Sequence, residues 1–474
     1  MLVLVLESST TSAKAMLYCS DRGVIRIETE AYPPHFNING IQDAEGVFKR
    51  TVDLGRMVSE GKEIDMIALC GTWHNVMLCD RQMKPISPAY SWSYTGASQV
   101  AKDLRKDKSY TNAFYQKTGC MVHAIYPAFK LLYIRNQGFD IENCYICGQG
   151  SYNFFHLTGE RLVSDSMASG SGLLNITSRQ YDIDILKEIG IKEEQLGRLV
   201  SYKDIRPLSK KGAELLGLES GIPVIPANPD GGLNQVGAGA LRDGIMTFSV
   251  GTSGAMRLST SNPVLPEQPS IWCYLSPYSW MSGAATSGAC NCIDWIKGKM
   301  FSSSTTYSEI ESKKTNNNTY PVFLPFLYGE RCPGWQDERK AGFFDVLPTH
   351  APLDFYLGVM EGVLFNLYQC YEVLCNVNGK PKKIQLSGGI LNSRIWTQMC
   401  CDIFQQEMEC STLEQTSMLG AAILSMEING VVDNVKNHKV EKGTIICPDE
   451  KMKTVYNEKY QRYKYWYYKT KSEE

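Results

Sequence analysis

The sequence lacks a long hydrophobic run and lacks an excess of charge of either sign. No stretch approaches the roughly 18 consecutive apolar residues that a membrane-spanning helix needs, and the apolar start MLVLVL has neither a basic region before it nor a cleavage site after it. The 48 basic and 50 acidic residues leave a formal charge of -2, which gives no electrostatic reason to expect nucleic acid or an anionic membrane as a partner. We therefore expect a cytoplasmic protein whose partner is a small molecule.

Two common nucleotide-binding signatures are also missing. The sequence has no GxxxxGK[ST] motif, and no GxGxxG motif stands between a strand pattern and a helix pattern, so a P-loop enzyme and a dinucleotide-dependent dehydrogenase are unsupported.

The 16 cysteines are scattered, and the CxxC pair of Cys144 and Cys147 has no second cluster that would complete a structural zinc site. We expect free thiols that serve mainly in packing.

The sequence does contain two similar segments about half a chain apart, and each is typical of the start of a domain. The first, LVLVLESSTTSAKAMLY, and the second, FSVGTSGAMR at 248–257, each run from a hydrophobic strand into a turn of small hydroxyl residues. A length of 474 residues exceeds the size at which a single core stops growing, so two domains are expected.

The predicted helices and strands that follow these two segments come in the same order. Apolar spacing predicts a helix at 44–59 and a strand at 65–70 in the first half, and a helix at 355–375 and a strand at 383–386 in the second. The pattern favours a duplicated domain, and a chance likeness between short Gly-Thr-Ser turns is the alternative. The polar stretch 302–319 predicts a loop, and the aromatic, basic tail at 459–474 predicts a terminal helix that packs its rings.

The hydroxyl-rich turns suggest a use for the duplication. Backbone N–H groups freed by a tight turn, with hydroxyls beside them, can hold phosphate oxygens, and one turn from each domain could clamp a polyphosphate. Between the halves lies VIPANPDGGLNQVGAGA, where Asp230 follows a strand and a proline and precedes two glycines. This context predicts a turn with an exposed carboxylate at its tip, which could be a general base toward a hydroxyl or an ordinary solvated turn residue.

Taken together and in order, these segments resemble the FGGY family of carbohydrate kinases. LESSTTSAKA is similar to the first phosphate motif of the family, NPDGGLNQVGAG to its catalytic-aspartate motif and FSVGTSGAMR to its second phosphate motif. PFLYGERCPGW, LSGGILNSRIWTQMCCDIF and TSMLGAAIL are similar to its C-terminal signatures, so the resemblance covers nearly the whole chain. It implies an α/β fold of two duplicated ribonuclease H-like domains, of the actin and hexokinase type, with ATP in the cleft between the lobes.

The resemblance also implies that the two domains bind different ligands. The N-terminal domain, at 1–241, would be the sugar-binding lobe with the first phosphate motif and the catalytic aspartate. The C-terminal domain, at 242–474, would be the ATP-binding lobe with a helical tail. Such a protein is a phosphotransferase with an alcohol group as acceptor, and it uses ATP and Mg²⁺.

Roles carried over by position give a set of candidate site residues. Asp230 would take the proton from the attacking hydroxyl, and Glu7 would hold Mg²⁺. The candidates for contact with the sugar are Trp73 and His74 from GTWHN, together with Asp230 and Gly231. The candidates for ATP binding are Thr10, Thr11, Ser12, Gly251, Thr252, Ser253, Gly388, Gly389 and Asn392.

The branch of the family is indicated by a few longer segments. KTGCMVHAIYPAFKLLYIRN, SMASGSGLLNI and VGTSGAMR resemble gluconate kinases, which makes gluconate the first candidate substrate and xylulose or another pentulose or polyol the second. Several positions depart from the family pattern, namely Glu7 for aspartate, Ser9 for glycine, Tyr94 and Gly96 in a substrate segment, and Gly150 and Ser151 for lysine and glutamate. They leave open a nucleotide- or sugar-binding homologue with impaired catalysis. Members of the family are often dimers, so a homodimer is a candidate assembly.

Overall fold

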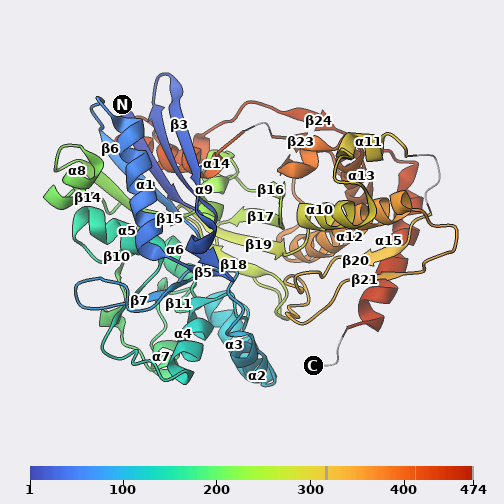
Figure 1. Cartoon of the computed structure of the whole chain (residues 1–474), viewed down its shortest axis with the longest axis horizontal. Coiled ribbons are helices and arrows are strands. Elements are labelled where there is room, and N and C mark those ends of the chain that lie inside the picture. The colour runs from blue at the N-terminus through green and yellow to red at the C-terminus, as the bar shows by residue number, and fades with distance from the viewer. Residues whose placement is uncertain (315–318, 412, 472–474) are drawn as a thin grey trace.

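The computed structural model describes residues 1–314, 319–411 and 413–471, which form two lobes side by side (Figure 1). The first lobe is built on a six-stranded sheet of order β14-β15-β6-β1-β2-β3. Its strands are β1 (Leu2–Ser8), β2 (Ser12–Cys19), β3 (Gly23–Ala31), β6 (Met66–Gly71), β14 (Arg206–Pro207) and β15 (Pro223–Pro229).

The central strand β1 is buried on both faces, as its unbroken Leu and Val pattern predicts. Leu4 and Leu6 pack under α1 (Ala44–Ser59), α5 (Gln149–Thr158) and α8 (Lys210–Leu216). Val3 and Val5 point the other way, toward α9 (Asp230–Gly237) and α14 (Thr416–Ile428). Because successive side chains of a strand alternate between faces, a strand covered by helices on both sides must be apolar throughout.

The second lobe repeats this sheet. Its order is β18-β19-β17-β16-β22-β23-β24, in which β16 pairs antiparallel with β17 and parallel with β22, as β1 pairs with β2 and with β6. The strands are β16 (Ile245–Val250), β17 (Gly254–Thr260), β18 (Trp272–Leu275), β19 (Trp280–Thr286), β22 (Lys383–Ser387), β23 (Met408–Cys410) and β24 (Thr444–Ile446). Apart from the added edge strand β18, order and directions match, so the predicted duplication is confirmed.

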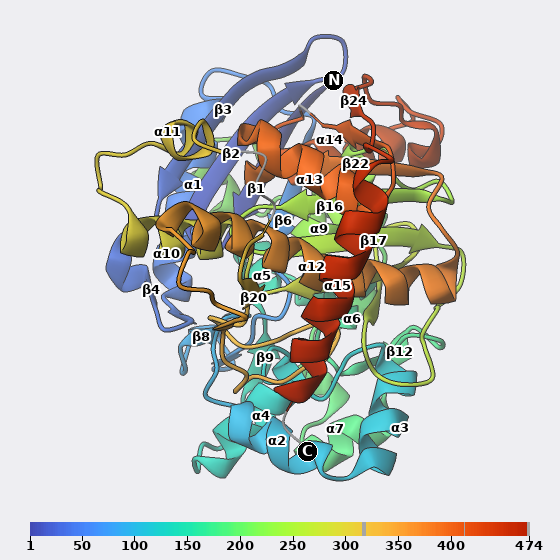
Figure 2. The same cartoon turned by 90° about the vertical axis from the view of Figure 1, so that its right-hand side faces the viewer.

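Helices complete the second lobe, and they include the predicted terminal one. They are α10 (Cys290–Met300), α11 (Tyr307–Glu311), α12 (Pro352–Asn378), α13 (Arg394–Phe404) and α15 (Met452–Lys469). Figure 2 shows α15 crossing α12 on the outer side of the lobe. Tyr456, Tyr460, Tyr463 and Tyr467 of α15 are buried, which confirms that the aromatic tail packs its rings.

The remaining elements are short, and most of them lie between β6 and β15 in the sequence. The helices are α2 (Ser98–Arg105), α3 (Lys108–Thr118), α4 (Pro127–Asn136), α6 (Asp165–Ser169) and α7 (Ile183–Ile189). The strands are β4 (Asn37–Ile38), β5 (Ile41–Gln42), β7 (Met77–Cys79), β8 (Ala89–Tyr90), β9 (Tyr145–Cys147), β10 (Leu162–Ser164), β11 (Leu174–Asn175), β12 (Gln180–Tyr181), β13 (Arg198–Val200), β20 (Val322–Leu324) and β21 (Gly342–Phe344).

The lobes are joined where α9 and α14, equivalent helices of the two copies, cross. A side chain on Gly237 would collide with the carbonyl oxygen of Thr416, and one on Gly420 would collide with that of Leu233. The two helix backbones therefore touch directly, which only glycine permits. Two residues before Gly237, the side chain of Gln235 bonds both Thr247 and Ser259 of the second sheet.

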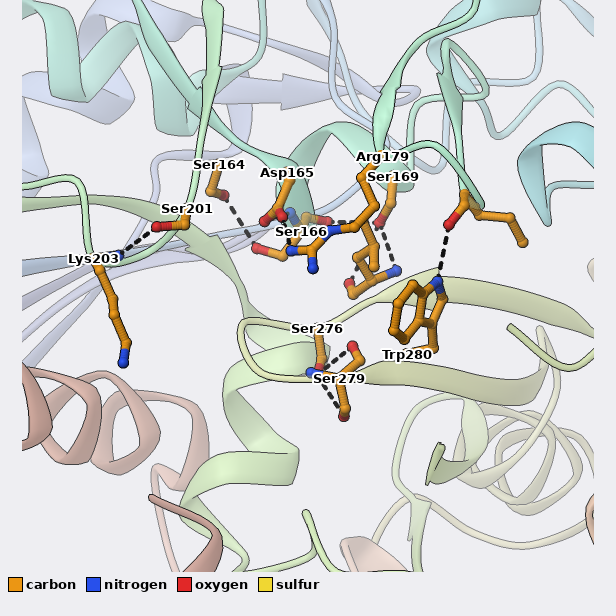
Figure 3. Close-up of polar contacts among 12 residues, drawn as sticks. Ser164, Asp165, Ser166, Ser169, Arg179, Ser201, Lys203, Ser276, Ser279 and Trp280 are labelled. Carbon is orange, nitrogen blue, oxygen red and sulfur yellow. Dashed lines mark hydrogen bonds and ion pairs between the residues drawn. The ribbon is translucent and has the colours of Figure 1, made fainter. Parts of the chain in front are cut away.

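A hairpin of the second lobe forms the other junction (Figure 3). The β18–β19 hairpin reaches the α6 segment, where the N–H of Leu275 donates to Ser169 Oγ at 3.0 Å and Trp280 Nε1 donates to the carbonyl of Ile176 at 2.9 Å. The guanidinium of Arg179 lies over the Trp280 ring and pairs with Asp165. The hairpin thus brings second-lobe aromatic residues into the first lobe.

Three of the predicted segments can be compared directly with these elements. The helix at 44–59 and the strand ending at Gly71 are confirmed. The polar stretch 302–319 is not all loop, because α11 forms within it, and residues 315–318 lie outside the described part.

All cysteines are free, and no group of three or more potential metal-binding side chains occurs among the described residues. No helix in the described ranges is long and apolar enough to cross a membrane.

Candidate active site

Three strands of the first sheet end in register at one edge. Ser8 at the end of β1 pairs with Gly71 at the end of β6, and Gly71 pairs with Pro229 at the end of β15. The turn that begins at Ser9, the substrate segment after Gly71 and the acid after Pro229 therefore emerge together. The carboxyl edge of parallel strands is where α/β proteins gather functional groups.

Asp230 is the first residue of α9, not the tip of an exposed turn as the sequence predicted. Its side chain is half-buried, and Oδ1 accepts a hydrogen bond from the backbone N–H of Gly231 at 2.7 Å. Burial, reinforced by the negative charge of Glu7, raises the pKa of Asp230 to about 6, although Arg257 and the Gly231 N–H act in the opposite direction. A carboxylate with a raised pKa is a stronger base than one in water, and it is still ionised at neutral pH.

Glu7 is buried at the end of β1 with both carboxylate oxygens engaged. Lys14 Nζ donates to Oε1 at 2.8 Å, while Ser417 Oγ, at 2.6 Å, and Cys70 Sγ, at 3.3 Å, donate to Oε2. Ser417 belongs to the first turn of α14, so this carboxylate also links the first lobe to a helix of the second half. Its negative charge is balanced locally by Lys14.

Trp73 and His74 are fixed by contacts on several sides. Trp73 Nε1 donates to the carbonyl of Ser166 at 2.9 Å, and its ring lies 5.1 Å from that of Tyr274 on the hairpin. His74 has a φ of 65°, in the left-handed region that few non-glycine residues occupy. Trp73 lies beside Gly231, the neighbour of Asp230, since a side chain on Gly231 would be 2.6 Å from the Trp73 ring, and the His74 ring is 6.2 Å from that of Trp73.

The protonation state of His74 follows from its surroundings. Burial, with a smaller contribution from Arg331, lowers the pKa of His74 well below its ordinary value, so the ring is neutral at pH 7. Nδ1 lies 2.6 Å from the carbonyl oxygen of Gly170, which can only accept, so Nδ1 carries the proton. Nε2 is then an acceptor, which suits a sugar hydroxyl.

Lys130 is a site residue that the sequence interpretation missed. It is fully buried, and Nζ donates to the carbonyls of His74 at 2.7 Å, Ser91 at 2.6 Å and Ile125 at 2.9 Å. Burial lowers the pKa of Lys130 well below its ordinary value. The side chain holds three loops around the substrate segment together, and its position within KTGCMVHAIYPAFKLLYIRN was the available signal.

The first phosphate turn is largely bonded to itself. Ser9 Oγ accepts from the N–H of Ser12 at 3.1 Å and from that of Thr11 at 3.4 Å, and it also donates to the carbonyl of Ser12. Thr10 Oγ1 accepts from Trp92 Nε1 at 2.9 Å. Ser9 therefore occupies two N–H donors of this turn, which are then not free for a ligand.

The second phosphate turn is open. Gly251, Thr252 and Ser253 are at least partly exposed, and the hydroxyls and backbone N–H groups of Thr252 and Ser253 have no partner within the described residues. Gly388, with a φ of 96°, lies against this turn, because a side chain there would be 2.5 Å from the carbonyl oxygen of Val250.

Gly389 and Asn392 follow directly in the exposed η3 turn (Gly389–Asn392). All the predicted ATP-binding residues of the second lobe therefore lie along one edge of its sheet. No hydrogen bond or ion pair among the described residues joins this edge to the turn of Thr10–Ser12.

Two arginines were also missed by the sequence interpretation. Arg257, inside FSVGTSGAMR, places Nε 3.2 Å from where a side chain on Gly231 would begin. Arg331, inside PFLYGERCPGW, is close enough to His74, Tyr274 and Arg257 to affect the pKa of each. Both lie within motifs of the sequence, but only the structure places Arg257 beside Gly231 and Arg331 near His74.

Two of the departures from the family pattern adjoin the substrate segment. Gly150 and Ser151 of α5 line a cavity of about 70 Å³ that also includes Thr72, His74 and Asn75. A side chain on Gly150 would meet the β-carbon of Ala227 at 2.7 Å, so a lysine would not fit. Tyr94 stacks among Tyr90 and Tyr133 instead of presenting a charge.

Comparison with known families gives matches along almost the whole chain. The model of the N-terminal domain of the FGGY family of carbohydrate kinases matches residues 2–237, and that of the C-terminal domain matches residues 246–426.

Among curated proteins, the gluconokinase of Bacillus subtilis is 27% identical over 453 residues, covering 90% of this chain and 88% of its own. The xylulose kinase of Escherichia coli is 24% identical over 434 residues, covering 89% and 88%.

Solved structures agree on the fold. A gluconate kinase from Lactobacillus acidophilus superposes with a TM-score of 0.91 at 23% identity, covering 98% of this chain and 97% of its own. A ligand-bound xylulose kinase from the same organism gives a TM-score of 0.92 at 23% identity, covering 98% and 96%.

Proposed function

The chain belongs to the FGGY family of carbohydrate kinases, and on this premise we propose that it transfers the γ-phosphoryl group of ATP to a hydroxyl of gluconate or a closely related sugar acid. The observation that supports the mechanism best is the placement of Asp230. It is the acid at the carboxyl edge of the first sheet that is half-buried, has a raised pKa and adjoins the substrate segment.

Asp230 is the general base in this proposal. Its carboxylate accepts the proton of the attacking hydroxyl as the oxygen forms its bond to the γ-phosphorus, and ADP leaves. His74 accepts a hydrogen bond from a second hydroxyl through Nε2, and Trp73 and Gly231 form the wall beside it. Positioning supplies much of the acceleration in such a reaction, and the fixed geometry of Trp73 and His74 suits that role.

ATP is held mainly by the second lobe. The free donors of Thr252 and Ser253 with Gly251 would bind phosphate oxygens, and the backbone of Gly388, Gly389 and Asn392 would lie along the adenosine. Thr10, Thr11 and Ser12 would contribute from the first lobe.

Mg²⁺ would neutralise phosphate charge when bound with ATP. Glu7 suits contact through water better than direct coordination, because both of its oxygens already accept hydrogen bonds.

Gluconate is the first candidate substrate, and xylulose is the second. The gluconokinases of B. subtilis and Bacillus licheniformis, each 27% identical over 90% of this chain, favour the former. The 24% identity to the xylulose kinase of E. coli favours the latter. The cavity beside His74, where charged residues of relatives are absent, is consistent with a change in which acceptor is bound.

An assay of ADP release over gluconate, xylulose, ribulose, glycerol and related polyols tests this proposal. We expect turnover with gluconate above the other acceptors, and about 10³-fold slower turnover in the Asp230→Asn variant. Tight ATP binding without turnover of any acceptor would instead indicate a binding protein with impaired catalysis.

A further inference from the structure

Two guanidinium groups lie at the lobe junction without an acceptor. The Nε atoms of Arg257 and Arg331 are buried and unpaired, and neither side chain makes a hydrogen bond or ion pair within the described residues. A buried charged donor that lacks a partner is costly, so such groups usually mark a place where a ligand supplies the acceptor.

Arg257 is positioned by its strand. It lies on β17 opposite Gly283 of β19, and the Trp272 ring covers Gly283 so closely that no side chain would fit there. The guanidinium passes Gly231 next to Asp230, but it forms no ion pair with that carboxylate. Its donors therefore lie beside the acid without being bonded to it, although the two charges attract each other.

Arg331 approaches from a neighbouring loop. The N–H of the following residue, Cys332, donates to the carbonyl of Ala285 at 3.2 Å, two positions along β19 from Gly283. The charge of Arg331 lies near His74, Tyr126 and Tyr274 and so belongs to the sugar side of the site. It adds to burial in lowering the pKa of Arg257, as expected for two like charges close together.

The charges around the two arginines do not balance. Glu7 is paired with Lys14, His74 is neutral, and Lys130 donates to carbonyl oxygens. Of the two positive charges, only that of Arg257 lies beside a carboxylate, that of Asp230, so the region keeps an excess of positive charge. An anion bound in this region would restore the balance, and a planar carboxylate matches the fork of donors that a guanidinium presents.

We propose that Arg257 and Arg331 together bind the carboxylate of the acceptor substrate, and that this contact selects a sugar acid over a neutral sugar or polyol. The inference rests on the proposed kinase function and names the chemical class that the site accepts. The main competing role for the same guanidinium groups is contact with the γ-phosphate of ATP. The surroundings of Arg331 favour contact with the acceptor. They include His74 and Tyr274, whereas the phosphate turns follow the ends of β1 and β16.

The test compares potassium D-gluconate with D-glucitol, which carries a neutral CH₂OH group in place of the carboxylate. In the wild-type protein we expect kcat/KM for gluconate to exceed that for glucitol by about 100-fold, the usual scale for a buried charge pair. Arg257→Gln should remove most of that preference, and Arg257→Lys should restore part of it. Arg206→Gln is the matched control, because Arg206 pairs with Glu160 on the outer edge of the first sheet and should leave the preference intact.

The outcomes separate the two levels of the proposal. Turnover of no acceptor by the wild-type protein would contradict the kinase function itself. Equal turnover of gluconate and glucitol, or a loss in Arg257→Gln that falls equally on both, would overturn the carboxylate site alone. A rise in KM for ATP that matches the loss for gluconate would assign the guanidinium to the phosphate instead. If Arg257→Gln does not fold, thermal protection of the wild-type protein by gluconate but not by glucitol is the required result, and equal protection would overturn the proposal.

Discussion

The two phosphate turns occupy equivalent places in the duplicated sheets, yet their hydrogen-bond donors are in opposite states. In the β1–β2 turn, Ser9 engages the N–H groups of Thr11 and Ser12, whereas in the β16–β17 turn those of Thr252 and Ser253 are free among the described residues. The same topology thus gives one turn that is closed by its own side chain and one that is open to a ligand. We infer that the first lobe specialises in the acceptor and the second in the nucleotide.

A second difference between the lobes is the residue that we propose as the general base. β15 is followed by Asp230, whereas the equivalent strand β23 ends at Cys410. Asp230→Asn should lower kcat by about 10³-fold, within the range for loss of a general base, with little change in ATP binding. Glu409→Gln on β23 is the control, since Glu409 pairs with Lys383 and not with the site. Full activity in Asp230→Asn would show that the two strand ends do not differ in function.

At the crossing of α9 and α14 the two lobes are alike, because each helix has a glycine that faces the backbone of the other helix. Substitutions are therefore tightly restricted there. Gly237→Ala should lower the free energy of unfolding by about 2 kcal/mol, because the added methyl group meets backbone and not a flexible side chain. Urea unfolding measures this change. Gly298→Ala in α10 has open space around the new methyl group and should be neutral or stabilising, by about 0.5–1 kcal/mol. Equal effects at the two positions would contradict direct backbone contact.

The pH dependence of catalysis should report the first-lobe carboxylates. Since the pKa of Asp230 is raised to about 6 and the base must be ionised to accept a proton, kcat/KM should rise with pH through about 6 and level off above it. The drop from pH 7 to pH 5 should be about tenfold. Glu7→Gln removes a charge that raises this pKa, so the acid limb should move to lower pH. A limb that stays in place in Glu7→Gln would contradict the coupling.

The open turn should contribute more to ATP binding than the closed one. Thr252→Val removes a hydroxyl that has no partner in the described structure, so KM for ATP should rise about tenfold. Thr11→Val is the matched change in the first turn. Its effect should be about twofold or less, because Ser9 already occupies the N–H groups of Thr11 and Ser12 that would hold a phosphate beside that hydroxyl. Calorimetric titration with ATP checks both variants. A larger loss at Thr11 would reverse the assignment of the two turns.

The smallest expected effect is a gain. Ser9→Gly removes the hydroxyl that occupies two N–H groups of the first turn, and ATP affinity should increase about threefold as those donors become available. Ser12→Ala leaves Ser9 in place and is the comparison variant. Weaker ATP binding in Ser9→Gly would mean that the serine organises the turn for phosphate.

Much of the fold follows from local sequence patterns. The run Leu2–Leu6 is apolar at every position because both faces of β1 are covered, and α1 begins after Asp43, whose carboxylate caps the helix through the N–H of Gly46. The duplication was visible because the turns after β1 and β16 kept similar small residues. These features depend on residues adjacent in the chain, so one sequence was enough to predict them.

The features that were missed depend on tertiary contacts. Pro229-Asp230 followed by two glycines is typical of a turn, but packing of α9 against α14 makes the segment helical. A fully buried lysine such as Lys130 is rare, and its three carbonyl partners come from separate loops. The partnerless state of Arg257 and Arg331 is a property of everything around them, which no local pattern encodes.

The glycine contact between α9 and α14 also limits how the two halves of the gene can evolve. Many loops and even the hydroxyl turns of the two copies have drifted apart. At Gly237 and Gly420 the backbone of each helix fills the space that a side chain of the other would need. A substitution in one copy there requires a shift in its twin, so the point where the duplicates meet is the one at which they cannot diverge independently.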